Sequence, residues 1–238
     1  MSVIRLFGFG PSGWGGLLLH AMGITISVTL CALLLGAVIG IPLAAARLSH
    51  RKSLQWVAEG YAAIFRGVPE LLIVYAVYFG GSGAVGGLLH LFGYKGFVSF
   101  PPFLAGVVAV GVISAAYQAE VFRGSYRAIK TGEIEAAVAI GMSRFTCFHR
   151  IMAPQIIRFS WPGFSYVFQL SVKDSSLVSV TGLVEIMRAT EVGSNSTSRY
   201  FQFYLAGAVL YLIISWLADV VFTAAEKRSG RSFRQVLS

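Results

Sequence analysis

The sequence predicts an all-α membrane protein with five transmembrane helices, its N-terminus outside the membrane and its C-terminus inside. Of its 238 residues, 56% are hydrophobic and only 12% are charged, and the mean hydropathy is +0.73. A soluble domain of this size would lack the polar residues needed to cover its surface, so the bilayer is expected to be its solvent. Five apolar runs can each cross a hydrocarbon core, which takes about 20 helical residues. The runs are Leu17–Ala46, Trp56–Phe79, Phe100–Val121, Phe159–Val184 and Phe201–Ala225.

The first run carries small residues at a regular spacing. Ala32, Gly36, Gly40 and Ala44 recur every four residues, which puts them on one smooth helix face where another backbone can approach closely. The alternative is that these small residues only make the helix flexible. The preceding residues 1–16 lack the charged start and cleavage site of a signal peptide, and an interfacial aromatic anchor fits them better.

The distribution of basic residues predicts the orientation. Thirteen of the 19 Lys and Arg lie in the segments after the first, third and fifth runs, which the positive-inside rule places in the cytoplasm. No aromatic or glycine pattern of an RNA or DNA module accompanies them, so we expect no nucleic-acid partner. Cys31 and Cys147 fall in a span and on the cytoplasmic side, which argues against a disulfide. With no internal repeat and no soluble domain, residues 1–238 form one membrane domain.

A polar, basic loop of residues 128–158 separates the third and fourth runs. Apolar residues recur at helical spacing from Ile134 to Gly141, and a second short amphipathic helix is expected over residues 145–152. Gly141 would permit a sharp bend between the two helices, and Pro154 would end the second. Such a loop can rest on the lipid headgroups, but we favour a helix that inserts into a cleft of a cytoplasmic partner.

Six residues of this loop have the spacing of the coupling loop of ATP-binding-cassette importer permeases: Glu135, Ala136, Ala137, Gly141, Ile151 and Pro154. Four further segments resemble signature segments of the polar amino-acid importer permeases, so that the resemblance covers nearly the whole chain. They are Arg66–Glu70, Ala116–Gly124, Ala153–Gln155 and Lys173–Ser179. The chain departs from the family pattern at Ala153, where Leu is usual, and at Ser175, where Thr is commoner. Because Ala153 lies in the loop, this change could alter which ATPase docks there.

The resemblance implies a bacterial inner-membrane, multi-pass permease subunit that forms one half of a two-permease pore. It implies cytoplasmic ATP-binding subunits, a periplasmic solute-binding protein and a second permease, either homologous or identical. No cofactor would bind this chain, since ATP would bind the partner ATPase. The sequence itself has no phosphate-binding Gly-x-x-x-x-Gly-Lys-Ser/Thr stretch, no nucleophile with a base and no metal-ligand spacing, so neither an enzyme nor a metal site is expected.

Two other classes of membrane protein are alternatives to an importer permease. An ion-coupled secondary amino-acid transporter would be expected to show an inverted repeat and more spans per chain, and neither is visible. A non-transporting membrane assembly protein would have no need of charged residues inside its spans.

Those charged residues are the candidates for the substrate path: Glu70, Lys173 and Asp174, with Ser175 beside them. Arg66 lies one helical turn before Glu70 and could simply pair with it. The family resemblance favours a substrate role for Glu70, because permeases for histidine, arginine and related cationic compounds can carry an acid there. It therefore points to a cationic amino acid or an arginine-derived opine such as octopine or nopaline.

Lys173 and Asp174 are adjacent, so on a helix they point about 100° apart and cannot satisfy one another. Lys173 could meet a substrate carboxylate and Asp174 a substrate amine. Salt bridges to other helices or to the facing subunit are equally open. Glu120 is expected to pair with Arg123 near the cytoplasmic end of its helix.

Overall fold

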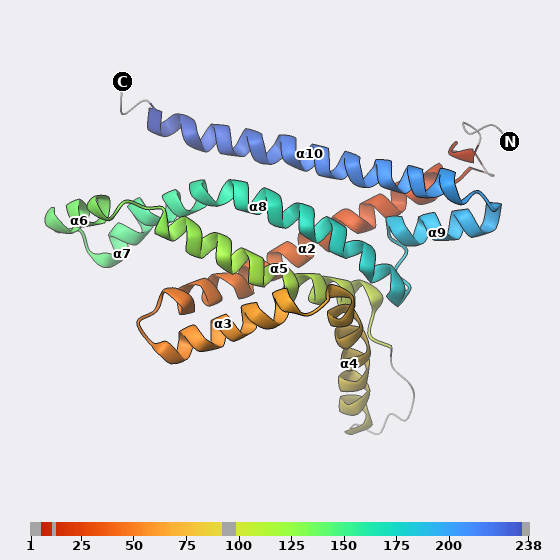
Figure 1. Ribbon diagram of the computed structural model, residues 1–238, viewed down its shortest axis with the longest axis horizontal. Coiled ribbons are helices and arrows are strands. Elements are labelled where there is room, and N and C mark those ends of the chain that lie inside the picture. Colours follow the sequence, from red (N-terminus) through yellow and green to blue (C-terminus); the bar gives the residue numbers. More distant parts are fainter. Residues whose placement is uncertain (1–5, 11–12, 92–98, 235–238) are drawn as a thin grey trace.

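A computed structural model describes residues 6–10, 13–91 and 99–234, and all the regular elements in these ranges are helices (Figure 1). The α-helices are α2 Gly15–Leu48, α3 Lys52–Gly67, α4 Glu70–Leu91, α5 Pro102–Arg127, α6 Thr131–Ala139, α7 Arg144–Cys147, α8 Ala153–Ser175, α9 Ile186–Thr197 and α10 Tyr200–Arg234. A π-helix, η1 Phe148–Met152, joins α7 to α8, and a 3-10 helix, η2 Ser176–Thr181, follows α8.

The long helices α2, α5, α8 and α10 form the body of the molecule (Figure 1). The α2 helix packs along α5, and α8 packs against α5, α10 and α2. The α4 helix projects away from this body, and α9 covers the end at which α10 begins (Figure 1).

Four helices of the described chain are long and apolar enough to cross a membrane: α2, residues Glu70–Gly87 of α4, α5, and residues Tyr200–Ser229 of α10. The predicted fourth span, Phe159–Val184, corresponds to α8 and η2, which are more polar but lie among the apolar helices. The prediction of an all-α membrane protein is confirmed. The count of five spans and the orientation of the termini stay predictions.

The predicted second span is wrong as a single helix. A break at Val68 and Pro69 divides Trp56–Phe79 between α3 and α4. Val68 is extended, with φ −87° and ψ 136°, and its amide closes the last turn of α3 on the carbonyl of Ile64. A residue before proline is pushed out of the helical region, and proline itself has no N–H to continue the ladder. The carbonyl of Pro69 instead accepts the amides of Leu72 and Ile73 and so begins α4.

The small residues of α2 form the predicted packing face. Ala32, Gly36, Gly40 and Ala44 are all buried, and α5 lies against them. The backbones come so close that a Cβ at Gly40 would lie 3.1 Å from the carbonyl oxygen of Ala115. In addition, Gln118 donates from its side-chain amide to the carbonyl of Leu33 at 3.0 Å.

Replacing Gly36 with valine should therefore separate α2 from α5. A Cβ at Gly36 would overlap the Ser114 hydroxyl and the Gln118 amide, and overpacking of this kind typically costs about 1–3 kcal/mol. We expect a lower melting temperature for the purified protein. Gly23→Val on the same helix, where a Cβ would meet nothing within 4 Å, is the control and should melt like the wild type. Equal melting temperatures for both variants would contradict close packing at Gly36.

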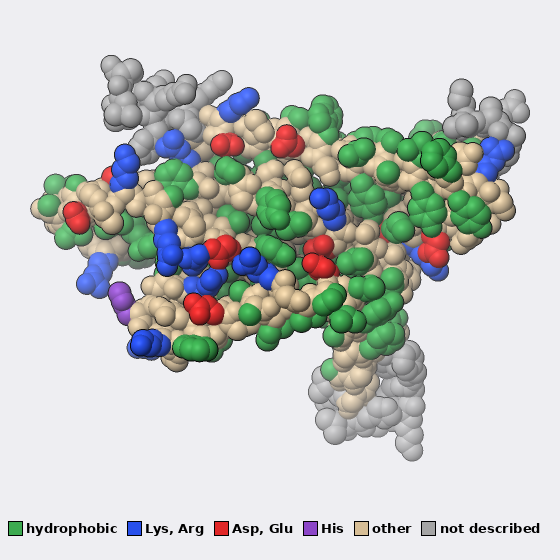
Figure 2. Space-filling model, in the orientation of Figure 1, with side chains coloured by type: hydrophobic (Ala, Val, Ile, Leu, Met, Phe, Trp, Pro, Cys, Tyr) green, Lys and Arg blue, Asp and Glu red, His purple; other side chains and the backbone are tan. Residues whose placement is uncertain are grey.

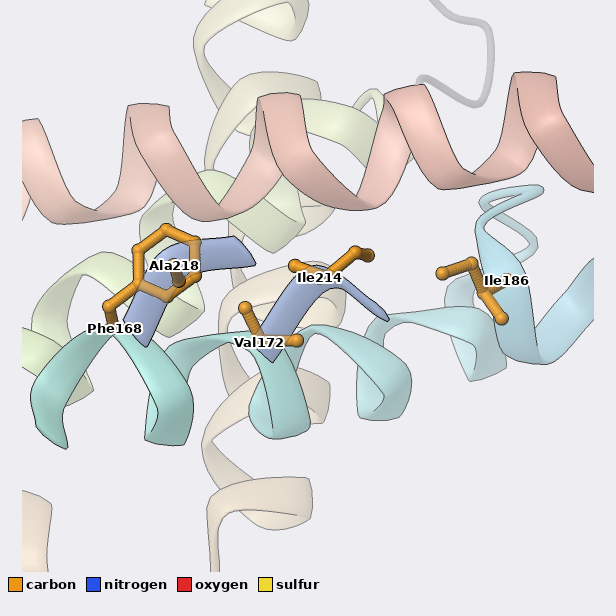
Figure 3. Close-up of a cluster of buried hydrophobic side chains, with 5 residues drawn as sticks. All are labelled: Phe168, Val172, Ile186, Ile214 and Ala218. Carbon is orange, nitrogen blue, oxygen red and sulfur yellow. The ribbon is translucent and has the colours of Figure 1, made fainter. Parts of the chain in front are cut away.

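A cluster of buried apolar side chains joins α8, α9 and α10 (Figure 3). It consists of Phe168 and Val172 from α8, Ile186 from α9, and Ile214 and Ala218 from α10. The cluster ties the C-terminal half of the chain to α8, on which three of the predicted substrate-path residues lie.

The three basic segments lie at one end of the molecule. The turn between α2 and α3, the α6–α7 loop and the final turns of α10 gather there, whereas α9 and the start of α2 lie at the other end (Figure 1). One membrane side can therefore hold all three, as the positive-inside rule requires.

Cysteine labelling tests this orientation. In a background without Cys31 and Cys147, a cysteine at Ser53 should be shielded from an impermeant thiol reagent in intact cells, whereas one at Ser196 should react. Both serines are exposed, so burial does not confuse the comparison. The opposite labelling pattern would reverse the orientation.

Candidate functional site

The loop between α5 and α8 is an ordered structure with a glycine-dependent turn. The α6 helix ends in a pair of capping hydrogen bonds, from the amide of Met142 to the carbonyl of Ala137 and from the amide of Gly141 to the carbonyl of Val138. This is the Schellman arrangement, which places the residue after the cap in a left-handed conformation. Gly141 has φ +80°, a region where other residues are strained. The predicted bend at Gly141 is confirmed.

The second half of the loop differs from its prediction. Ser143 caps α7 by accepting the amide of Thr146 at 3.2 Å, and the chain then remains helical through η1 into α8. Pro154 is the second residue of α8 and does not end a helix. Its missing N–H is tolerated because the preceding turns widen into a π-helix, in which the Ala153 amide reaches back to the carbonyl of Phe148.

Of the six residues matched to the coupling loop, four line a hollow and two lie outside it. Ala136, Ala137, Ile151 and Pro154 line a hollow of about 700 Å³ between α6, the start of α8 and the end of α10. Gln155 on α8 holds the rim together by donating to the Glu133 carboxylate on α6 at 2.6 Å.

Glu135 and Gly141 do not line that hollow and are exposed. Beside them, Val138, Ile140 and Phe145 project large apolar side chains that are 60%, 75% and 72% exposed. The tip of the loop therefore presents an apolar patch next to a carboxylate, which suits insertion into a cleft of another protein.

The second candidate site gathers the charged residues of the predicted substrate path. Glu70 begins α4 at the Pro69 break, and Asp174 lies in the last turn of α8. Both are half-buried, and their carboxylates interact electrostatically with each other and with the Tyr117 hydroxyl on α5. The fold thus brings together two acids that are 104 residues apart in the sequence.

The neighbours of Asp174 are placed differently. The Lys173 side chain is exposed, while Ser175 is buried and donates its hydroxyl to the carbonyl of Val172 at 2.7 Å. The Ser175 hydroxyl can therefore still accept a hydrogen bond, but its proton is already donated to Val172.

Three ion pairs are present in the described ranges: Arg47–Glu120, Arg123–Glu120 and Arg188–Glu191. The predicted pairing of Glu120 with Arg123 is confirmed, and Arg47 joins it. None of the three includes Arg66 or Glu70. The Arg66 guanidinium instead lies over the ring of Tyr117, 5.5 Å from its centre. Basic and acidic side chains appear together over α3 and α5 in Figure 2. The first two thirds of α10 expose large apolar side chains from Phe201 to Val221.

A buried carboxylate that the sequence analysis missed lies at the start of α9. Glu185 is 1% exposed and accepts hydrogen bonds from the Tyr211 hydroxyl at 2.7 Å and the Arg188 amide at 2.9 Å. Thr25 of α2 also faces it, and the amide of Ile186 bonds to the Thr25 hydroxyl at 3.2 Å. The carboxylate thereby joins α2, α9 and α10. In the sequence, Glu185 could have been noticed as a single acidic residue within the apolar stretch 182–187.

Comparisons with known proteins agree with this geometry. Residues 32–231 match the family model described as "Binding-protein-dependent transport system inner membrane component". The octopine transport system permease protein OccQ of Rhizobium meliloti is 47% identical over 99% of both chains. The histidine/lysine/arginine/ornithine transport system permease protein HisQ of Escherichia coli is 32% identical over 91% of this chain and 94% of its own.

A solved structure has the same arrangement of helices. The crystal structure of an amino acid ABC transporter with histidines aligns with a TM-score of 0.76 and 28% identity, covering 90% of this chain and 95% of that one. The likeness covers most of the chain and is not confined to the loop.

Proposed function

The chain belongs to the family of binding-protein-dependent transport system inner membrane components, and on this basis we propose that it is the permease subunit of an importer for cationic amino acids or arginine-derived opines. The permease itself forms the path for the solute, and ATP is hydrolysed by separate subunits.

The observation that carries the choice of solute is the pair of carboxylates, Glu70 and Asp174. Two like charges near each other in a partly buried site repel, and either protonation of one acid or a cation between them relieves the repulsion. The described ranges place no arginine or lysine in an ion pair with either acid. A guanidinium or ammonium group of a solute would supply the missing positive charge and form charge-assisted hydrogen bonds. The names of the relatives, for octopine and for histidine, lysine, arginine and ornithine, support the same class.

The remaining residues of this site take complementary roles in the proposal. The exposed Lys173 ammonium is available for the carboxylate of the solute. Ser175 can accept one hydrogen bond at the rear of the site. The break at Pro69 leaves the amides of Glu70 and Leu71, the first two of α4, without partners inside their own helix, and transporters commonly use such ends at their binding sites.

The partners follow from the same proposal. One of two ATP-binding subunits would dock on the loop of residues 128–158 and the other on the matching loop of a second permease. In this chain the contact region would be formed by Glu135, Ala136, Ala137, Gly141, Ile151 and Pro154. A second permease, identical or homologous, would complete the pore in the bacterial inner membrane. A periplasmic solute-binding protein would deliver the solute at the opposite end. Closure of the ATPases would pull on the two loops and rock the halves between inward-open and outward-open states.

Reconstitution tests this function. The permease should be placed in liposomes with its ATPase and binding proteins, which adjacent genes would identify, and supplied with labelled arginine or octopine. Uptake should require ATP and the binding protein, and should persist when ion gradients are collapsed. Uptake driven by an ion gradient without ATP would instead indicate a secondary transporter. The absence of uptake of any cationic or neutral amino acid would indicate an assembly protein.

A further inference from the structure

A second hollow lies beside the Glu70–Asp174 site, between α2, α3 and α5. It has a volume of about 450 Å³, within the range of small-molecule sites. Small residues of α3 leave the space open, and charged or aromatic side chains surround it. The lining residues are Arg47, Glu59, Ala62, Ala63, Arg66, Gly67 and Tyr117.

Two of the charged residues in this hollow, Glu59 and Arg66, are exposed and take part in no ion pair within the described ranges. Arg47, by contrast, is paired with Glu120. Glu59 and Arg66 lie seven residues apart on α3, which is two helical turns or about 10 Å along the axis. The hollow therefore presents a negative group at one end and a positive group at the other.

The hollow shares Tyr117 with the surroundings of the proposed solute site. Arg66 rests on the Tyr117 ring, and the Tyr117 hydroxyl interacts electrostatically with Glu70 and Asp174. The α3 helix runs from the basic α2–α3 turn towards Pro69, so Glu59 lies nearer than Glu70 to the predicted cytoplasmic end. A solute that leaves the Glu70–Asp174 site for the cytoplasm would meet the hollow next.

We propose that this hollow is a second, exit-side binding site for the same class of solute, a zwitterion with a carboxylate at one end and a cationic group at the other. This inference rests on the proposed function. Arg66 receives the solute carboxylate, and Glu59 receives the ammonium or guanidinium. Tyr117 lines the hollow, and its ring under the Arg66 guanidinium keeps Arg66 oriented towards the exit side.

Equilibrium binding of labelled arginine to the purified transporter in lipid nanodiscs tests the proposal. The wild type should show two classes of binding site per permease chain. Glu59→Gln should weaken one class at least tenfold and leave the other unchanged, whereas Glu70→Gln should do the reverse. Agmatine, which is arginine without its carboxylate, should lose at least tenfold in affinity for the class that depends on Glu59.

Glu226→Gln is the matched control, because Glu226 is exposed on α10 and lines neither site. A single class of sites that Glu59→Gln leaves unchanged would overturn the exit site while leaving the proposed function intact. Equal weakening by Glu59→Gln and Glu226→Gln would overturn it as well. A wild type that binds neither arginine nor octopine would overturn the proposed function and this inference together.

Discussion

Replacing Gly141 with valine should abolish solute uptake while the protein still inserts into the membrane and its ATPase still hydrolyses ATP. Gly141 has φ +80° and closes the turn after α6. A left-handed backbone costs an ordinary residue roughly 1–2 kcal/mol, and a β-branched side chain is the least tolerant of it. The turn would rearrange and the apolar tip formed by Val138, Ile140 and Phe145 would no longer fit its partner. We expect at least a tenfold loss of ATP-driven uptake in reconstituted liposomes.

Gly141→Asn separates backbone conformation from side-chain size. Asparagine adopts the left-handed region far more readily than valine, and a Cβ at this position would meet nothing within 4 Å. It should therefore retain most of the uptake. Equal loss in both variants would show that the ATPase interface rejects any side chain at Gly141. Full uptake in Gly141→Val would remove the turn from the coupling mechanism.

The features that local spacing encodes were predictable from the sequence. The face of Ala32, Gly36, Gly40 and Ala44 follows directly from a four-residue repeat, and it packs on α5 as expected. The turn at Gly141 was also predictable, because glycine after a short amphipathic segment is a common helix end. In both cases the residues that signal the structure are neighbours along the chain.

Two predictions about where helices begin and end were wrong, and both concern a proline. The run Trp56–Phe79 is apolar enough to suggest one span, but the break depends on Val68 and Pro69 alone. Pro154 was expected to end a helix, whereas a π-helical turn before it absorbs the missing hydrogen bond. Proline permits a stop, a start or a bulge, and the choice depends on the residues packed around it.

Contacts between residues far apart in the sequence could not be predicted from residue spacing. Glu185 meets Thr25, which is 160 residues away, so its role as a link between helices has no local pattern. Glu70 and Asp174 could each be selected as charges inside apolar runs, but their proximity depends on how α4 and α8 both pack on α5. That proximity would let both acids meet the same cationic group of a solute.

Glu70→Gln should accordingly lower kcat/KM for a cationic solute by about ten- to a hundredfold, since a hydrogen bond to a charged group contributes about 1.5–3 kcal/mol. Glutamine keeps the shape of the side chain and removes the charge. It also relieves the repulsion with Asp174, so the abundance of the variant in the membrane should not fall.

Uptake of labelled arginine and of glutamine should be compared in Glu70→Gln and Arg66→Gln, with membrane abundance measured in each. A structural Arg66–Glu70 pair would make both variants lose abundance, or lose all solutes, together. Loss of the cationic solute in Glu70→Gln with glutamine uptake maintained would place Glu70 against the substrate. Unchanged discrimination between arginine and glutamine would make Glu70 a structural residue and return the solute to the neutral amino acids.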